Sequence, residues 1–266
     1  MAKRDRHVLS LSGGKDSTAL AVFMQDKVPE MEYVFCDTGK ELPETYEYLN
    51  KIEAYLGKPI ERLNADAGFD HWLEVFQGFL PSAQMRWCTK NLKLKPFEKF
   101  VGDDTVYSYI GIRADEDRMG YVSKKPNLIP VFPFKDAGIT KADVFRILED
   151  SGLSLPSYYE WRTRSGCYFC FFQRKAEWIG LKERHPDLFE LSKTYEKTNE
   201  ATGERYTWAP GESLVELEER EEEIMTNYRK ALARQKVSAP NRPLIELFDV
   251  AQDEEDDEQG CTICHV

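Results

Sequence analysis

Residues 7–17 read HVLSLSGGKDS: an apolar run, then a turn with two glycines, then the start of a second apolar stretch that reaches Met24. The run His7–Leu11 predicts a short buried strand, and Ser17–Met24 predicts a helix. Glycine lets a backbone approach a ligand closely, and the following helix offers unpaired N–H groups and the positive end of its dipole. The order strand, loop, helix therefore predicts a phosphate-binding site at the end of the first strand.

The polar residues of this loop suit a nucleotide that carries a metal ion. Lys15 supplies a fixed positive charge, and we expect the Asp16 carboxylate to hold Mg²⁺ on the phosphate oxygens, since it would otherwise repel them. A Gly-rich turn without a ligand is the alternative, and it leaves these polar residues unexplained. The loop lacks the Gly-Lys-Ser/Thr ending of a Walker motif, which argues against transfer of a γ-phosphoryl group. The predicted nucleotide ligands in the loop are Ser12, Gly13, Gly14, Lys15, Asp16 and Ser17.

Beyond the loop, apolar runs alternate with a helical pattern. The expected strands are Glu32–Cys36, Ile60–Leu63 and Val106–Ile112, and Pro43–Leu56 is an expected helix with Pro in its first turn and Gly57 beyond its end. This alternation predicts an α/β fold with a doubly wound, mainly parallel sheet and a helical, cysteine-bearing C-terminal part.

The chain is expected to have three parts. They are a nucleotide-binding core at residues 1–135, a helical extension at 136–235, and an acidic flexible tail at 236–266. The helices expected in the extension are Thr140–Glu149, Ala176–Tyr195 with an interruption at Pro186, and Ser213–Gln235.

Charge and hydropathy limit the partners and the location. The formal net charge is −11, whereas binding nucleic acid unaided requires clustered Lys and Arg. We therefore expect any DNA to be presented with help from other proteins. No apolar run approaches the ~18 residues that cross a bilayer, and the N-terminus lacks the apolar segment of a signal peptide. This predicts a cytoplasmic protein without a membrane partner; the oligomeric state stays open.

The loop Ser12–Ser17 has the pattern Ser-Gly-Gly-x-Asp-Ser and in this resembles the PP-loop ATP pyrophosphatases. The resemblance implies an adenine nucleotide alpha-hydrolase-like fold. It also implies cleavage of ATP to AMP and pyrophosphate, usually through an adenylylated intermediate.

Further stretches, from about residue 7 to 180, resemble the phosphoadenosine phosphosulfate (PAPS) reductase-like branch of that superfamily. Phe35–Gly39, read FCDTG, followed by Leu42–Thr45, is similar to its second-strand motif. This similarity implies that Asp37, Thr38 and Gly39 face the nucleotide.

A second element, Gly111–Arg118, is similar to the Gly-Ile-Arg-x-x-Glu-Ser-x-x-Arg element of that branch, although Asp117 replaces Ser and the second arginine falls early. Arg113 is the residue carried over, because an arginine at a strand end can clamp a phosphate with two hydrogen bonds. A surface ion pair with Asp115 or Glu116 is the alternative.

Reductases of this branch generally carry a degenerate phosphate loop, whereas this loop is complete. The chain therefore resembles most the ATP-using sulfur-transfer proteins of DNA phosphorothioation, the Dnd and Ssp systems. That resemblance implies a sulfurtransferase that activates a DNA phosphate with ATP through Lys15, Asp16 and Arg113, with a cysteine desulfurase as sulfur donor. The alternatives are a PAPS or adenylylsulfate reductase that releases sulfite, and a nucleotide-binding regulatory subunit.

The chain has six cysteines, and a reducing cytosol disfavours structural disulfides. Cys88 and the later pair Cys167 and Cys170 are similar in spacing to the cluster-bearing adenylylsulfate reductases, but Trp87 replaces one of two adjacent cysteines. The similarity implies a [4Fe-4S] cluster on three thiolates with an open fourth position. Completion by a tail cysteine, zinc, and free thiols remain the alternatives.

The tail ends in a second Cys-x-x-Cys pair, Cys261 and Cys264, followed by His265. Three interpretations stay open for it: a mobile reactive thiol, a metal clip, or a disordered end. Cys36, within an apolar strand, is expected in the core.

Overall fold

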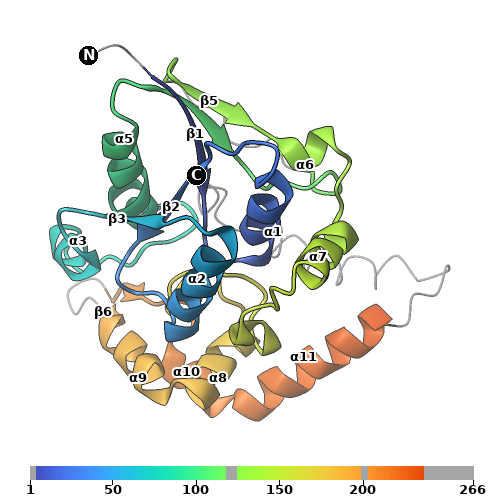
Figure 1. Cartoon of the computed structure of the whole chain (residues 1–266). Helices are drawn as coiled ribbons and strands as arrows, with labels where there is room; N and C mark the ends of the chain where they lie inside the picture. Colours follow the sequence, from blue (N-terminus) through green and yellow to red (C-terminus); the bar gives the residue numbers. More distant parts are fainter. Residues whose placement is uncertain (1–3, 118–124, 199–202, 237–266) are drawn as a thin grey trace.

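The computed structural model describes residues 4–117, 125–198 and 203–236. At its centre lies a sheet whose five strands run in the order β3-β2-β1-β4-β5, every neighbouring pair being parallel (Figure 1). The strands are β1 (Asp5–Ser10), β2 (Glu32–Asp37), β3 (Ile60–Asn64), β4 (Thr105–Tyr109) and β5 (Leu128–Val131). The predicted α/β fold with a parallel sheet is confirmed.

Both faces of the sheet are buried, as a parallel sheet requires. Successive side chains of a strand point to opposite faces, so Leu9 belongs to the apolar core under α1 (Lys15–Met24), α2 (Pro43–Leu56) and α7 (Lys141–Asp150). Val8 points the other way, into the core under α5 (Lys95–Val101). Figure 1 shows α1 and α5 on opposite sides of the strands.

The strand order reverses between β1 and β4. From β1 the chain passes through α1 to β2 on one side, and it returns only after β3 to place β4 on the other side of β1. The loops that follow β1 and β4 are therefore neighbours at the carboxyl edge of the sheet, which is the usual ligand site of such folds.

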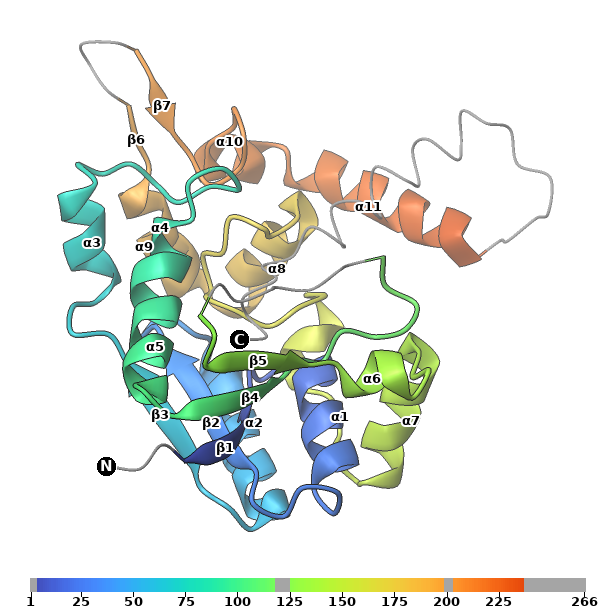
Figure 2. The same cartoon turned by 90° about the horizontal axis from the view of Figure 1, so that it is seen from above.

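Further helices build a third apolar cluster around Trp178, Phe189 and Trp208. They are α3 (Phe69–Val75), α4 (Trp87–Thr89), α8 (Lys175–Arg184), α9 (Pro186–Tyr195), α10 (Leu214–Glu219) and α11 (Glu221–Lys236). Figure 2 shows α8 to α11 gathered away from the five-stranded sheet, with α11 extending outward. In contrast, α7, the first helix of the predicted extension, packs its buried Val144 and Leu148 into the core beside α1.

Two elements differ from the sequence prediction by more than one or two residues at an end. The predicted helix Ser213–Gln235 is two helices, because Arg220 leaves the helical conformation with φ −107° and ψ 18°. The predicted strand Val106–Ile112 ends at Tyr109; Ile110 and Ile112 are buried without extending it.

Several smaller elements complete the described chain. They are a π-helical segment (Lys90–Leu94), α6 (Pro133–Asp136), a 3-10 turn (Ser157–Glu160), and the hairpin of β6 (Lys197–Thr198) and β7 (Arg205–Tyr206). Every helix in the described ranges is too short or too polar to cross a lipid bilayer.

Candidate active site

Both glycines of the loop after β1 are required by the local geometry. Gly13 has a φ of +72°, and a Cβ there would lie 2.8 Å from Cγ2 of Thr45. Gly14 precedes α1 in an extended conformation, and a Cβ there would lie 2.7 Å from Oγ of Ser165. A side chain at Gly13 would be strained and would collide with Thr45, and one at Gly14 would collide with Ser165. Glycine at both positions leaves the backbone of the loop accessible to a ligand.

The hydroxyl groups of the loop hold its turn. Ser12 Oγ accepts a hydrogen bond from Gly14 N at 3.3 Å and lies 3.1 Å from Ser17 Oγ. Thr18 Oγ1 donates to the Gly14 carbonyl at 2.8 Å. The first turn of α1 is therefore preorganised next to the loop, as a phosphate site at a helix N-terminus requires.

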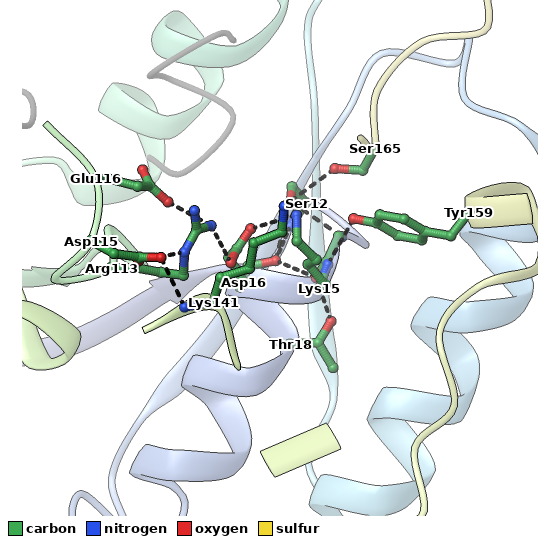
Figure 3. A network of polar contacts seen from close by, with 12 residues as sticks. Ser12, Lys15, Asp16, Thr18, Arg113, Asp115, Glu116, Lys141, Tyr159 and Ser165 are labelled. Atoms are coloured by element: carbon green, nitrogen blue, oxygen red, sulfur yellow. Dashed lines mark hydrogen bonds and ion pairs between the residues drawn. The ribbon is translucent and has the colours of Figure 1, made fainter. Parts of the chain in front are cut away.

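The three predicted catalytic residues meet at the start of α1 (Figure 3). Asp16 lies between two cations: its Oδ1 is 2.9 Å from Arg113 Nη1 and its Oδ2 is 3.2 Å from Lys15 Nζ. Arg113 also contacts Glu116 at 2.7 Å and Asp115 at 3.0 Å. Burial alone would lower the pKa of Arg113, but the charges of Asp16 and Glu116 outweigh it and raise that pKa. Arg113 thus belongs to a mostly buried ion network and not to an isolated surface pair.

The loop after β4 is packed directly onto α1. A Cβ on Gly111 would lie 3.2 Å from the Asp16 carbonyl oxygen, so the backbone approaches as closely as glycine allows. This contact brings Arg113 to the loop after β1 across the point where the strand order reverses. Arg118, the second arginine of the predicted element, lies outside the described residues.

The end of β2 supplies the other predicted nucleotide residues. Asp37 Oδ1 accepts hydrogen bonds from Gly39 N and from the Tyr46 hydroxyl, each at 2.8 Å. Thr38 is buried and donates to Glu41 Oε1 at 2.9 Å. Asp37 is therefore fixed at the strand end, whereas the Thr38 hydroxyl is directed at a buried carboxylate.

Two tyrosines that the sequence analysis did not single out contact the phosphate loop. The fully buried Tyr158 donates its hydroxyl to the Gly13 carbonyl at 2.7 Å. The Tyr159 hydroxyl accepts a hydrogen bond from Lys15 N at 3.0 Å. Both lie more than 140 residues after the loop, and no local spacing signals the contact.

Ser165 forms a third link to the loop. Its Oγ donates to Ser12 Oγ at 3.1 Å, and Figure 3 shows it approaching from the C-terminal half of the chain. The segment just before the Cys-x-x-Cys pair is thus attached to the phosphate loop.

The loop that carries Cys167 and Cys170, called the cysteine loop below, contacts residues at the end of β2. Cys167 Sγ lies 3.2 Å from Thr38 Oγ1 and 3.6 Å from Glu41 Oε1, and burial together with Glu41 raises the pKa of this thiol. Cys170 N donates to the Cys167 carbonyl at 3.1 Å. Cys88 packs against the same apolar cluster as Cys167.

These cysteines do not by themselves form a metal site. Within the described ranges, no three His, Cys, Asp or Glu side chains gather as a group able to hold a metal ion. Cys261 and Cys264 lie outside those ranges, so the cluster and the role of the tail stay predictions. Cys36 is buried, as expected, and burial raises its pKa to about 11.

Comparison with curated proteins finds relatives without an assigned function. Two uncharacterized proteins of Methanocaldococcus jannaschii are 28% and 25% identical, over 69% and 68% of this chain. The chain spans 40% and 45% of their length. An uncharacterized nin region protein of Escherichia phage lambda is 27% identical over 66% of this chain and 68% of its own length.

Two solved structures are similar at low sequence identity. PAPS reductase from Candida auris, in a phosphate complex, is 15% identical with a TM-score of 0.48, over 61% of this chain and 81% of that one. The U34-tRNA thiolase NcsA from Methanococcus maripaludis, with its [4Fe-4S] cluster, is 17% identical with a TM-score of 0.41, over 72% of this chain and 70% of that one.

The family match covers the sheet, the phosphate loop, Arg113 and the cysteine loop together. Residues 6–172 match the family model of the phosphoadenosine phosphosulfate reductase domain, more than half of the chain. The chain therefore belongs to the phosphoadenosine phosphosulfate reductase domain family.

Proposed function

We propose that this protein is an ATP pyrophosphatase that activates an acceptor by adenylylation for sulfur transfer. The observation that carries the proposal is the meeting of Lys15, Asp16 and Arg113 at a complete, preorganised phosphate loop. A reductase whose substrate already holds an activated sulfate has no need of such a loop.

The charges of this group support Mg²⁺ as a companion of ATP. Asp16, Asp115 and Glu116 bring three carboxylates to the two cations Lys15 and Arg113. Within this group the net charge is negative and would repel a nucleotide, whereas a divalent ion on the Asp16 carboxylate would reverse that. Mg²⁺ would supply charge neutralisation at the phosphates.

The residues then have separate tasks in the proposed reaction. An acceptor oxygen attacks the α-phosphorus, and the bond to the bridging oxygen breaks so that pyrophosphate leaves with that electron pair. Lys15 and Arg113 stabilise the negative charge that develops on the phosphate oxygens. A cysteine desulfurase delivers sulfur as a persulfide, and a thiol reductant, which is oxidised to a disulfide, releases it as sulfide. Sulfide then attacks the acceptor phosphorus, and AMP leaves with the electron pair of the broken P–O bond.

The cysteine loop is suitably placed for the sulfur step. Ser165, hydrogen-bonded to the phosphate loop, is only two residues before Cys167. A [4Fe-4S] cluster or zinc on Cys88, Cys167 and Cys170 is retained as part of this proposal. No step is assigned to it, because the described residues do not form the site. Visible absorption after anaerobic purification, with iron and zinc analysis, tests it.

A DNA phosphate is the acceptor that we propose. The guanidinium carbons of Arg86 and Arg164 lie 5.0 and 5.5 Å from the ring centroid of Phe172. Arg86 is two residues before Cys88, and Arg164 is three residues before Cys167. Each arginine is therefore close in sequence to a cysteine of the predicted metal site. Guanidinium groups stacked on an aromatic ring are suited to contact a nucleic-acid backbone. The net charge of −11 favours a partner that presents the DNA.

An assay of sulfur transfer to DNA tests the proposal that a DNA phosphate is the acceptor. The anaerobic protein is incubated with ATP, Mg²⁺, a cysteine desulfurase with cysteine, a thiol reductant and DNA, and phosphorothioate is scored after nuclease digestion. We expect phosphorothioate that depends on ATP and falls in the Arg86→Ala variant. Sulfite released from PAPS or adenylylsulfate, without ATP cleavage, would instead favour the reductase. Full biological function of an Asp16→Asn variant would favour the regulatory subunit.

A further inference from the structure

Tyr159 holds a backbone donor of the phosphate loop that a bound phosphate would be expected to use. Its hydroxyl oxygen accepts the Lys15 N–H at 3.0 Å, and Lys15 is the first residue of α1. Figure 3 shows the tyrosine pointing into the loop, toward Lys15. The Lys15 ammonium lies 5.6 Å from the centroid of the same ring. The phenol is thus close to both the backbone N–H and the ammonium group of Lys15.

The hydroxyl proton of Tyr159 has no acceptor among the described residues. A phenol can accept and donate at once, and here only the accepting side is used. Burial raises the pKa of Tyr159, so the group remains a neutral donor over the physiological range. Tyr159 is partly buried beside the phosphate loop, so an oxygen of a bound phosphate could accept its hydroxyl proton.

The position of Tyr159 is fixed by its neighbours. Tyr158 is fully buried and bonded to the Gly13 carbonyl, and the two rings stack with centroids 4.9 Å apart. Arg162 N donates to the Tyr158 carbonyl at 2.9 Å. The turn therefore presents Tyr159 to the loop from a rigid base, as a ligand residue requires.

We propose that Tyr159 is a ligand of the nucleotide phosphates: its hydroxyl accepts the Lys15 N–H and donates its own proton to a phosphate oxygen. The inference rests on the proposed ATP site. It adds a residue from the C-terminal half of the chain to a site whose other predicted ligands follow β1, β2 and β4.

Binding measurements on the full chain test this without turnover. The probes are α,β-methylene-ATP with Mg²⁺, inorganic pyrophosphate, and adenosine, measured by calorimetry. Tyr159→Phe keeps the ring and removes the proton, and we expect about ten- to hundredfold weaker binding of the two phosphate probes, since a hydrogen bond to a charged group is lost. Adenosine binding should not change. Tyr159→His, which restores a donor, should recover part of the loss.

Tyr158→Phe is the matched control. It removes a buried hydrogen bond to the loop backbone, so it should lower the melting temperature more than Tyr159→Phe does. Equal affinity of the wild-type protein and Tyr159→Phe for both phosphate probes would overturn the proposal. So would a loss in Tyr159→Phe that His does not restore and that a lowered melting temperature accompanies.

The binding test of Tyr159 does not depend on whether the protein cleaves ATP. If the wild-type protein binds α,β-methylene-ATP but cleaves no ATP, the Phe and His variants still decide the role of Tyr159 while the proposed function fails. If the wild-type protein binds neither phosphate probe, both proposals fail.

Discussion

Gly13 shows how much of the site depends on single atoms. Its φ of +72° lies in the left-handed region, and the Cβ that any other residue adds would meet Thr45 Cγ2. Substitution of Gly13 would therefore destabilise the fold in two independent ways, through backbone strain and through a steric collision. Gly57, at the end of α2, has a similar φ of +62° but open space around it, and so separates the two costs.

We expect Gly13→Ala to lower the free energy of unfolding by about 2–4 kcal/mol, the sum of left-handed strain and a tight contact. Gly57→Ala should cost about 1–2 kcal/mol, from strain alone. Denaturant unfolding measures both. Thr45→Ser, which removes the colliding methyl, should recover part of the loss in the Gly13→Ala background. Equal costs at the two glycines, with no recovery, would show that the contact with Thr45 is unimportant.

At the scale of elements, α10 depends on one carboxylate. Glu216 accepts hydrogen bonds from Ser213 N at 2.7 Å and Ser213 Oγ at 2.9 Å, completing a capping box. A hydrogen bond from Arg205, joined by the bonds from Ser213, lowers the pKa of Glu216 to about 2. The same carboxylate thus joins β7 to the start of α10.

The lowered pKa of Glu216 predicts the direction in which the stability of the protein changes with pH. Because the folded-state pKa is lowered, the contribution of Glu216 is complete above the unfolded value, about 4.3, and is lost as the pH falls through about 2. The stability difference between wild type and Glu216→Gln, from urea unfolding, should therefore shrink from pH 6 to pH 2. Glu222→Gln, at an exposed site in α11, is the control and should show no such trend. A constant difference across the range would contradict the capping role.

At the scale of the molecule, the tryptophans report on only one part of the chain. All five lie in or against the apolar cluster around Phe189, away from the two sheet cores: Trp72, Trp87, Trp161, Trp178 and Trp208. The hydrogen bonds of Tyr158, Tyr159 and Ser165 tie this cluster to the phosphate loop.

We therefore expect tryptophan fluorescence and far-UV circular dichroism to give the same unfolding midpoint, as one cooperative unit does. Pyrophosphate, which should bind only the folded loop, should raise both midpoints together. The double variant Tyr158→Phe/Ser165→Ala should separate them, whereas Leu191→Ala, on the exposed side of α9, should not. Separate midpoints in the wild-type protein would show that the two parts unfold independently.

The sequence predicts what local signals encode and misses what distant contacts create. The phosphate loop and the boundaries of Pro43–Leu56 follow from glycine, proline and apolar spacing. The strand predicted at Val106–Ile112 is shorter, because apolar residues continue past the last paired residue. Tyr159 and Ser165 reach the loop from about 150 residues away, and no period in the sequence records such a contact.

The central claim is that the loop and its ion network bind ATP for cleavage between the α- and β-phosphates. The measurement is release of AMP and pyrophosphate from α-labelled ATP with Mg²⁺ by the anaerobically purified chain, with DNA and a cysteine desulfurase present. The proposal predicts release that falls about a hundredfold in Asp16→Asn and is unchanged in Asp66→Asn, an exposed carboxylate paired with Lys99. Release that is absent from the wild-type protein, or equal in the Asp16→Asn variant, would contradict it.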